Sequence, residues 1–182
     1  MIDLVLKNLN CIIFLELKSY HFCNQKMKKM KWLLQSGDHY RGLISRITLG
    51  IVILPHGLQL TFGWFGGHGF AASMEYFTNT MGLPWIVGLL VILLQSLAVL
   101  FIVAGVAARL MAMATIFLFV GMIVSAHLEY GFFMNWYGNQ KGEGFEYHLL
   151  VIGLALQLFF DGAGKYSVDF LLSKRKLTIN TL

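Results

Sequence analysis

The chain has 182 residues, of which 57% are hydrophobic and only 13% are charged. A soluble domain carries about 25% charged residues, so this composition excludes an ordinary soluble fold and indicates one membrane domain. The formal net charge is +5, but the basic residues lie where they orient a membrane protein, and we expect no nucleic-acid partner.

The N-terminal region is predicted to be an extension of the membrane domain. The first 26 residues are interrupted by charges too often for a membrane span, and they lack the basic start of a signal peptide. Met27 opens the basic run MKKMKWLL, so we expect residues 1–26 to be a mis-called start or a disposable part of a cytoplasmic extension over residues 1–40. Both cysteines, Cys11 and Cys23, lie here, which excludes dithiol chemistry in the membrane domain.

Four apolar stretches predict an all-α, integral membrane four-helix bundle. A membrane span needs about 20 mostly apolar residues. The stretches cover residues 43–62, 84–104, 110–128 and, more briefly, 147–160. Small residues are scattered through all of them and allow helices to approach closely in lipid. We therefore predict a bundle domain over residues 41–169 and a basic tail over residues 170–182.

The distribution of basic residues predicts the orientation of the bundle. Of the 14 Lys and Arg residues, all but Lys141 lie at or before Arg46, between the second and third spans, or after the fourth. By the positive-inside rule, both termini are cytoplasmic and the connections 63–83 and 129–146 face outward. The protein is then a multi-pass membrane protein with the lipid bilayer as its first partner.

Polar residues are predicted to gather at the outward ends of these helices. The first span ends in PHGLQLTFGWFGGHGF, where a proline inside a helix and a glycine-rich run predict a kink followed by a bent loop on the mouth of the bundle. The third span ends in SAHLEYGFF and the fourth begins in GFEYHLL. The polar residues expected at similar depth are His56, His127, Glu146 and His148, with Trp64 at the rim.

Each of these residues also has a plain structural interpretation. The histidines can be solvated residues at helix ends, and Glu146 can be a negative charge that the helix dipole stabilises at a helix N-terminus. Their convergence favours chemistry, because an ionisable residue inside a span is a functional candidate by default. No pair has the spacing of a metal motif, and the side chains of Glu146 and His148 point about 200° apart on a helix, so we expect no metal site. Imidazole and carboxylate groups that exchange protons beside aromatic rings suit a quinone head group or a proton relay better.

Gln95 is the other polar outlier, near the middle of the second span in VILLQSLAVL. It is interpreted either as a hydrogen-bonding contact between helices, together with Ser96, or as the floor of the outward-facing cavity.

Several fragments together resemble the DoxX family of small four-helix bacterial membrane proteins. They are RGLISRITLGIVILPHGLQLTFGWFGGHGF, MGLP, AARL, SAHLEYGFF, GFEYHLL and DGAGKYSVD, and they span residues 41–169. The positions that match the family's pattern are His56, Gly63, Trp64, Gly66, Gly67, His127 and Glu146. One departure is Gln95, in LLQSLA, where many relatives carry a glutamate in an AELLGG-like segment; glutamine keeps the hydrogen bonding but not the proton.

The resemblance implies a bacterial inner-membrane protein linked to quinone-dependent redox or oxidative-stress complexes. We therefore expect an accessory redox subunit whose outward pocket binds a quinone through His56, Trp64, Gln95, His127, Glu146 and His148. In this pocket Glu146, His127 and His56 exchange protons. The chain encodes no redox cofactor of its own, so an oxidoreductase role needs a redox enzyme subunit as partner.

Two other functions remain open from the sequence. A non-enzymatic scaffold would use its small-residue helix faces and basic tail to recruit a catalytic partner or to form a homo-oligomer. A small-molecule carrier is disfavoured, because the chain has no evident inverted repeat or paired broken helices.

Overall fold

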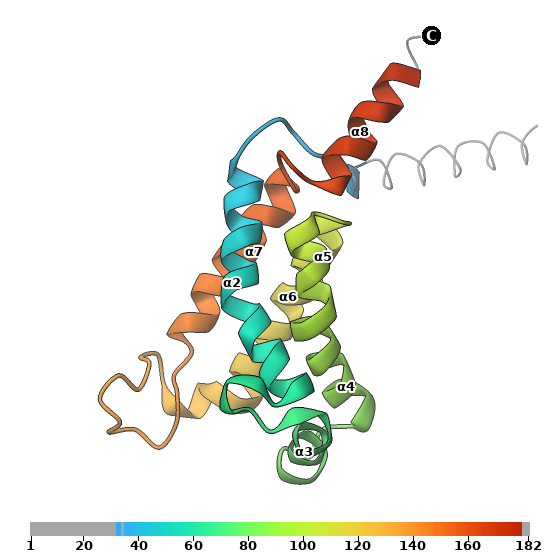
Figure 1. Ribbon diagram of the computed structural model, residues 1–182. Coiled ribbons are helices and arrows are strands. Elements are labelled where there is room, and N and C mark those ends of the chain that lie inside the picture. The colour runs from blue at the N-terminus through green and yellow to red at the C-terminus, as the bar shows by residue number, and fades with distance from the viewer. Residues whose placement is uncertain (1–31, 34, 180–182) are drawn as a thin grey trace, which may run out of the picture. The chain divides into compact units, whose positions relative to one another are not determined.

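The computed structural model describes residues 32, 33 and 35–179. The chain divides into two compact units, Met1–Leu33 and Leu34–Leu182, and only Trp32 and Leu33 of the first unit are described. The predicted start at Met27 therefore lies outside the described residues. The regular elements of the described part of the chain are all helices, and this part contains no β-strand (Figure 1).

Helix α2 (Arg41–Phe62) is the first long apolar helix and contains Pro55. Pro55 has no N–H to donate to the carbonyl four residues back, yet the helix continues for two further turns. It ends at Gly63, whose φ of 73° lies in the left-handed region and whose N–H donates to the carbonyl of Gln59. Glycine is the residue type that reaches this conformation without steric cost.

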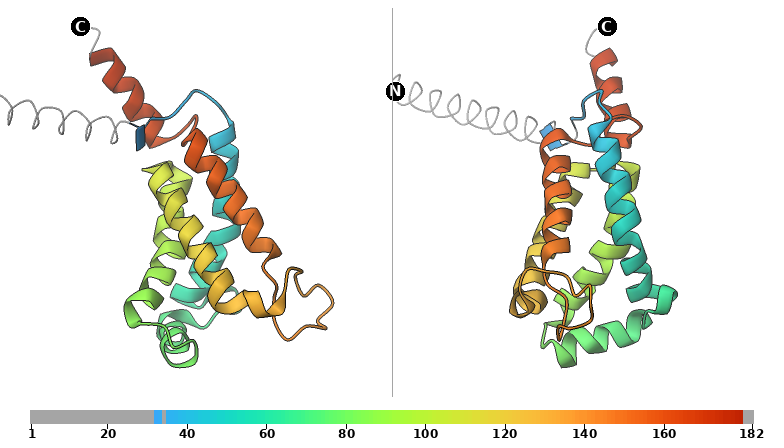
Figure 2. Two further views of the ribbon diagram at one scale, coloured as in Figure 1. Left: turned by 180° about the vertical axis from the view of Figure 1, so that it is seen from behind. Right: turned by 90° about the vertical axis from the view of Figure 1, so that its left-hand side faces the viewer.

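The connection after α2 was predicted to be a bent loop, but it is largely helical. A single 3-10 turn, η1 (Trp64–Gly66), leads into α3 (Gly69–Glu75), which continues as the π-helical turn η2 (Tyr76–Thr80). Helix α3 is seen end-on in Figure 1 and lengthwise in the right-hand view of Figure 2, so it lies across the ends of the long helices. The sequence signal for this helix, FAASMEYF, is masked by the four glycines that precede it.

The next two long helices each contain a π-helical turn. One is formed by α4 (Trp85–Leu93), η3 (Leu94–Ala98) and α5 (Val99–Ala104), and the other by α6 (Ala108–Met122), η4 (Ile123–His127) and the 3-10 turn η5 (Leu128–Tyr130). The three helices Arg41–Phe62, Trp85–Ala104 and Ala108–Tyr130 are long and apolar enough to cross a membrane. Their bounds lie within two residues of the predicted spans.

Helix α7 (Glu146–Asp161) packs against both α2 and α6. Its 16 residues rise about 24 Å, less than the roughly 30 Å of a hydrocarbon core. A fourth membrane crossing, and with it the predicted four-span bundle, therefore stays a prediction. Helix α8 (Val168–Ile179) follows and leads away from the packed helices in every view.

The core consists of apolar residues that α2, α5, α6 and α7 direct toward one another. Its fully buried members include Leu49, Val99, Ala112, Ala155 and Leu158. Alanines at the facing positions of α6 and α7 let these two helices approach closely, which is how helices associate where lipid removes the hydrophobic driving force.

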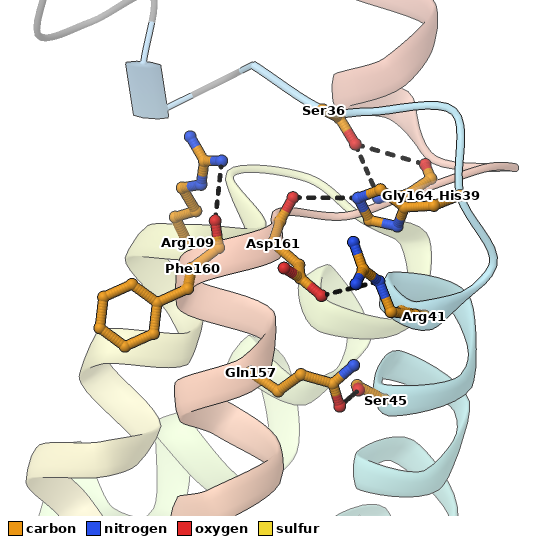
Figure 3. A network of polar contacts seen from close by, with 9 residues as sticks. All are labelled: Ser36, His39, Arg41, Ser45, Arg109, Gln157, Phe160, Asp161 and Gly164. Carbon is orange, nitrogen blue, oxygen red and sulfur yellow. Dashed lines mark hydrogen bonds and ion pairs between the residues drawn. The ribbon is translucent and has the colours of Figure 1, made fainter.

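One end of the structure holds a network of hydrogen bonds and ion pairs, which we call the basic end. Ser36 accepts the N–H of Gly164 at 2.6 Å, and the His39 Nε2–H donates to the carbonyl of Asp161 at 3.3 Å (Figure 3). The Asp161 carboxylate pairs with Arg41 at 3.2 Å. The segment that follows α7 is thereby fixed to the start of α2.

Arg46 lies at the centre of the basic end and is fully buried. Its guanidinium donates to backbone carbonyls on two sides, those of Val103, Ala163, Lys165 and Tyr166. A buried charge is costly unless its donors are satisfied, and here carbonyl oxygens from α5 and from the segment after α7 satisfy them. Arg46 therefore joins three separate parts of the chain.

Asp169, in the first turn of α8, completes the basic end. Its carboxylate accepts the N–H groups of Ala107 and Ala108, both at 2.9 Å, at the start of α6. Ala107 has a φ of 47°, a left-handed conformation that costs about 1 kcal/mol for a residue with a side chain. Burial raises the pKa of Asp169 above its ordinary value, while the accepted N–H bonds act in the opposite direction.

The other end, which carries α3 and the 131–145 connection, is called the loop end. Here α2 and η3 cross at Gly57, where a Cβ atom would collide with the backbone carbonyl of Gln95. The close approach of two backbones thus requires glycine at this position.

We expect Gly57→Ala to lower the free energy of unfolding by about 1–3 kcal/mol, because the new methyl group forces α2 away from η3. Thermal unfolding of the detergent-solubilised protein, followed by circular dichroism, measures this. Gly121→Ala in α6 is the matched control, since a Cβ there meets no atom within 4 Å. Equal effects of both substitutions would show that the crossing is not tightly packed.

Candidate functional site

Two of the predicted histidines lie in direct contact at the loop end. His127 ends the π-helical turn η4, and His148 lies in the first turn of α7. Their ring centroids are 4.2 Å apart with an angle of 46° between the ring planes. The packing of α6 against α7 brings the two rings together. π-helical turns are rare and occur often at functional sites, and this one carries His127.

His127 is fixed in orientation and in tautomer. Its Nδ1–H donates to the backbone carbonyl of Glu143 at 2.9 Å. In the neutral ring, Nε2 then carries no proton and is the basic nitrogen. His127 is therefore equipped to accept a proton next to His148.

His148 is buried, with only 3% of its surface exposed, and neither ring nitrogen has a hydrogen-bond partner among the described residues. The adjacent hydroxyl of Tyr147 is also buried without a partner. The Tyr147 ring contacts that of Phe119 at a centroid distance of 6.1 Å, and Phe119 in turn contacts His148 at 5.5 Å. Unpaired buried polar groups cost about 1–3 kcal/mol each, so their retention favours a function.

His56 connects this pair of rings to the surface. It is exposed on α2, one residue after Pro55, and its ring lies 6.2 Å from that of Tyr147. We call His56, His127, Tyr147 and His148 the ring cluster. The cluster draws on α2, on η4 and on the start of α7, and its three histidines come from the three membrane stretches that the sequence analysis named.

Glu146 lies beside the ring cluster but faces the neighbouring connection. Its carboxylate accepts the N–H of Met134 at 3.3 Å, and its own N–H donates to the carbonyl of Phe132. Glu146 is the first residue of α7, where the helix dipole stabilises a negative charge. Within the described part of the chain, no hydrogen bond joins Glu146 to a histidine.

The remaining predicted residues lie apart from the ring contacts. Trp64 is 59% exposed and packs against Phe62, with ring centroids 5.8 Å apart. Gln95 is buried in the π-helical turn η3, where its backbone carbonyl faces Gly57. Ser96 donates to Ile92 within its own helix rather than to another helix.

The chemistry of the ring cluster is proton exchange and hydrogen bonding. Among the described residues, no group of three or more His, Cys, Asp or Glu side chains is arranged to hold a metal ion. A row of polar rings leads from exposed His56 past Tyr147 to buried His148 and its neighbour His127. Imidazole groups take up and release protons near neutral pH.

Sequence reasoning missed Tyr147, Phe119 and the basic end. Tyr147 stands between two predicted site residues in GFEYHLL, and that position was the only available signal. The sequence analysis used Arg46 only to orient the protein in the membrane, and it gave Asp169 no role in a site. An arginine within an apolar run, four residues into the predicted span, was the signal for a buried polar network.

Over its described residues the protein is thus all-helical, with three helices that are long and apolar enough to cross a membrane. The model of the DoxX family matches residues 42–128, which confirms over this range the resemblance seen in the sequence. No curated protein and no solved structure matches the chain. The family range includes His56 and His127 but ends before Tyr147 and His148, so half of the ring cluster lies beyond it.

Replacing His148 by Phe is expected to stabilise the fold by about 1–3 kcal/mol, since the ring shape is kept and two unpaired buried nitrogens are removed. The matched variant His127→Phe loses a hydrogen bond to Glu143 and should be destabilised by about 1 kcal/mol. Thermal unfolding in detergent shows whether each substitution raises or lowers the free energy of unfolding. Destabilisation by His148→Phe would show that the His148 nitrogens are satisfied in the folded protein.

Proposed function

We propose that the protein is an accessory membrane subunit of a quinone-linked redox or oxidative-stress system, and that the ring cluster binds the quinone head group. The single observation that carries the proposal is His148, which is buried with both ring nitrogens unpaired, next to the unpaired hydroxyl of Tyr147. Such groups are retained where a ligand or a proton uses them.

The residues present suit a quinone head group. A quinone supplies a ring that takes up two electrons and two protons, and its two carbonyl oxygens accept hydrogen bonds. The Tyr147 hydroxyl and an imidazole N–H of His148 are donors for such oxygens, and the Phe119 ring offers an aromatic face nearby.

Proton movement is the chemical contribution of this chain. The basic Nε2 of His127 lies in the ring that contacts His148, and exposed His56 leads from the surface to Tyr147. Glu146 adds a carboxylate at the head of α7. Electrons must come from a redox enzyme subunit, because the predicted role gives this chain no electron carrier of its own. Gln95 cannot relay a proton, and its part is limited to packing and hydrogen bonding.

The proposed setting is the inner membrane of a bacterium, with α7 as the fourth crossing and both termini in the cytoplasm. The concentration of basic residues at the basic end supports this orientation. The loop end and the ring cluster then face outward.

The proposal predicts that His148→Phe and Tyr147→Phe each weaken quinone binding at least about tenfold, which corresponds to the loss of one good hydrogen bond. Binding of ubiquinone and menaquinone analogues is measured on protein in nanodiscs. His68→Ala removes an exposed histidine outside the ring cluster and is the control. Parent-like binding by His148→Phe, with the fold intact, would overturn the assignment, and His56→Ala and Glu146→Gln would then locate any remaining site.

A scaffold that recruits a catalytic partner is the second candidate. It is supported by α8, which Asp169 fixes to the start of α6 and which leads away from the other helices (Figure 1). In that case, loss of residues 170–182 would abolish capture of the partner, while ring-cluster variants would retain it. The redox proposal predicts instead that ring-cluster variants lose quinone binding and that loss of residues 170–182 leaves quinone binding unchanged.

A further inference from the structure

A groove lies on the side of the long helices, away from the ring cluster. It has a volume of about 350 Å³ and runs between the helix formed by α4, η3 and α5 and the start of α6. Its lining is entirely apolar: Leu90, Leu93, Leu94, Leu97, Ala98, Phe101, Val106, Ala107 and Met111. Leu97 is 53% exposed, so the groove opens on the surface of two helices that are apolar and long enough to cross a membrane.

The length of the groove matches one leaflet of a bilayer. Leu90 and Phe101 are separated along the helix by about 16 Å, at a rise of about 1.5 Å per residue. Half of a hydrocarbon core is about 15 Å thick. Because Leu94 lies near the middle of the span Trp85–Ala104, an extended hydrocarbon chain in this groove reaches from the basic end to slightly beyond the middle of the membrane.

The surface that the groove reaches is the basic end. Val106 and Ala107 close the groove there, and the N–H of Ala107 is bound by Asp169 of α8. Lys174 lies on the same helix, with its Nζ 4.7 Å from the ring centre of Phe170. The connections at the loop end, by contrast, carry Lys141 as their one basic residue. This difference in positive charge favours an amphiphile whose phosphate lies beside α8.

We propose that this groove is a binding site for one acyl chain of a phospholipid from the leaflet at the basic end. The acyl chain fills the apolar surface between η3 and α6, and the phosphate lies beside α8 on the side of Lys174. The lipid then packs against the turn that Asp169 holds, and so supports the junction between α5 and α6. This site is separate from the ring cluster and does not depend on the quinone proposal.

The test uses the full chain in nanodiscs with phosphatidylglycerol that carries a photoreactive diazirine on one acyl chain. After illumination, mass spectrometry of peptides locates the label. We expect labelling to concentrate in the peptide that covers residues 94–111, and unlabelled phosphatidylglycerol to compete it away. Label spread evenly over all apolar helices would overturn the proposal, as would displacement by ubiquinone at a lower molar excess than by unlabelled phosphatidylglycerol.

Two matched variants then separate the groove from the general lipid surface. Leu97→Trp fills the groove and should lower labelling of this peptide at least about fivefold. Leu100→Trp, at a neighbouring position that is 50% exposed but does not line the groove, should leave labelling unchanged. Equal labelling of both variants would overturn the proposal. The positions of the labelled peptides in the unsubstituted protein test the site even if a variant does not fold.

Discussion

The fold depends on how one buried cation is satisfied. Arg46 would be costly in a low-dielectric interior, and it is tolerated because carbonyls from α5 and from the segment after α7 surround its guanidinium. The same arrangement positions the backbone of residues 163–166, which sets where α8 begins and so where Asp169 meets α6. One side chain thereby determines the relative placement of α2, α5 and the last helix.

The two ends of the structure differ in how their charged and polar side chains are paired. At the basic end, charged side chains are paired with carbonyls, N–H groups and one another. At the loop end, His148 and Tyr147 keep buried polar atoms without partners among the described residues. Paired charges thus support the scaffold at the basic end, whereas the unpaired atoms of His148 and Tyr147 are retained where chemistry is proposed. This division is typical of proteins whose sites are less stable than their scaffolds.

The long helices could be predicted because apolar runs with glycine and proline at their ends leave few alternatives. The nearness of His127 and His148 also followed from the sequence, since both flank the same connection. Helix α3 could not be predicted, because its glycine-rich approach is typical of a loop. The direction of Glu146 depends on the backbone path of residues 131–145, and Arg46 required knowledge of which distant carbonyls surround it. Local patterns carry no information about such long-range contacts.

The π-helical turn at Gln95 has a consequence for how this protein can vary. A π turn accommodates one residue more than an α turn, and one residue corresponds to about 100° of rotation around the helix. Gly88 before the turn and Ala98 within it therefore face different neighbours than an unbroken helix would give them. The wide turn absorbs this extra residue, so removing a single residue here would restore a regular helix and leave the side chains of α5 on their present face. Removing a residue from a regular part of the helix would instead turn them by about 100°. The π turn is therefore the position where the length of this helix can change by one residue.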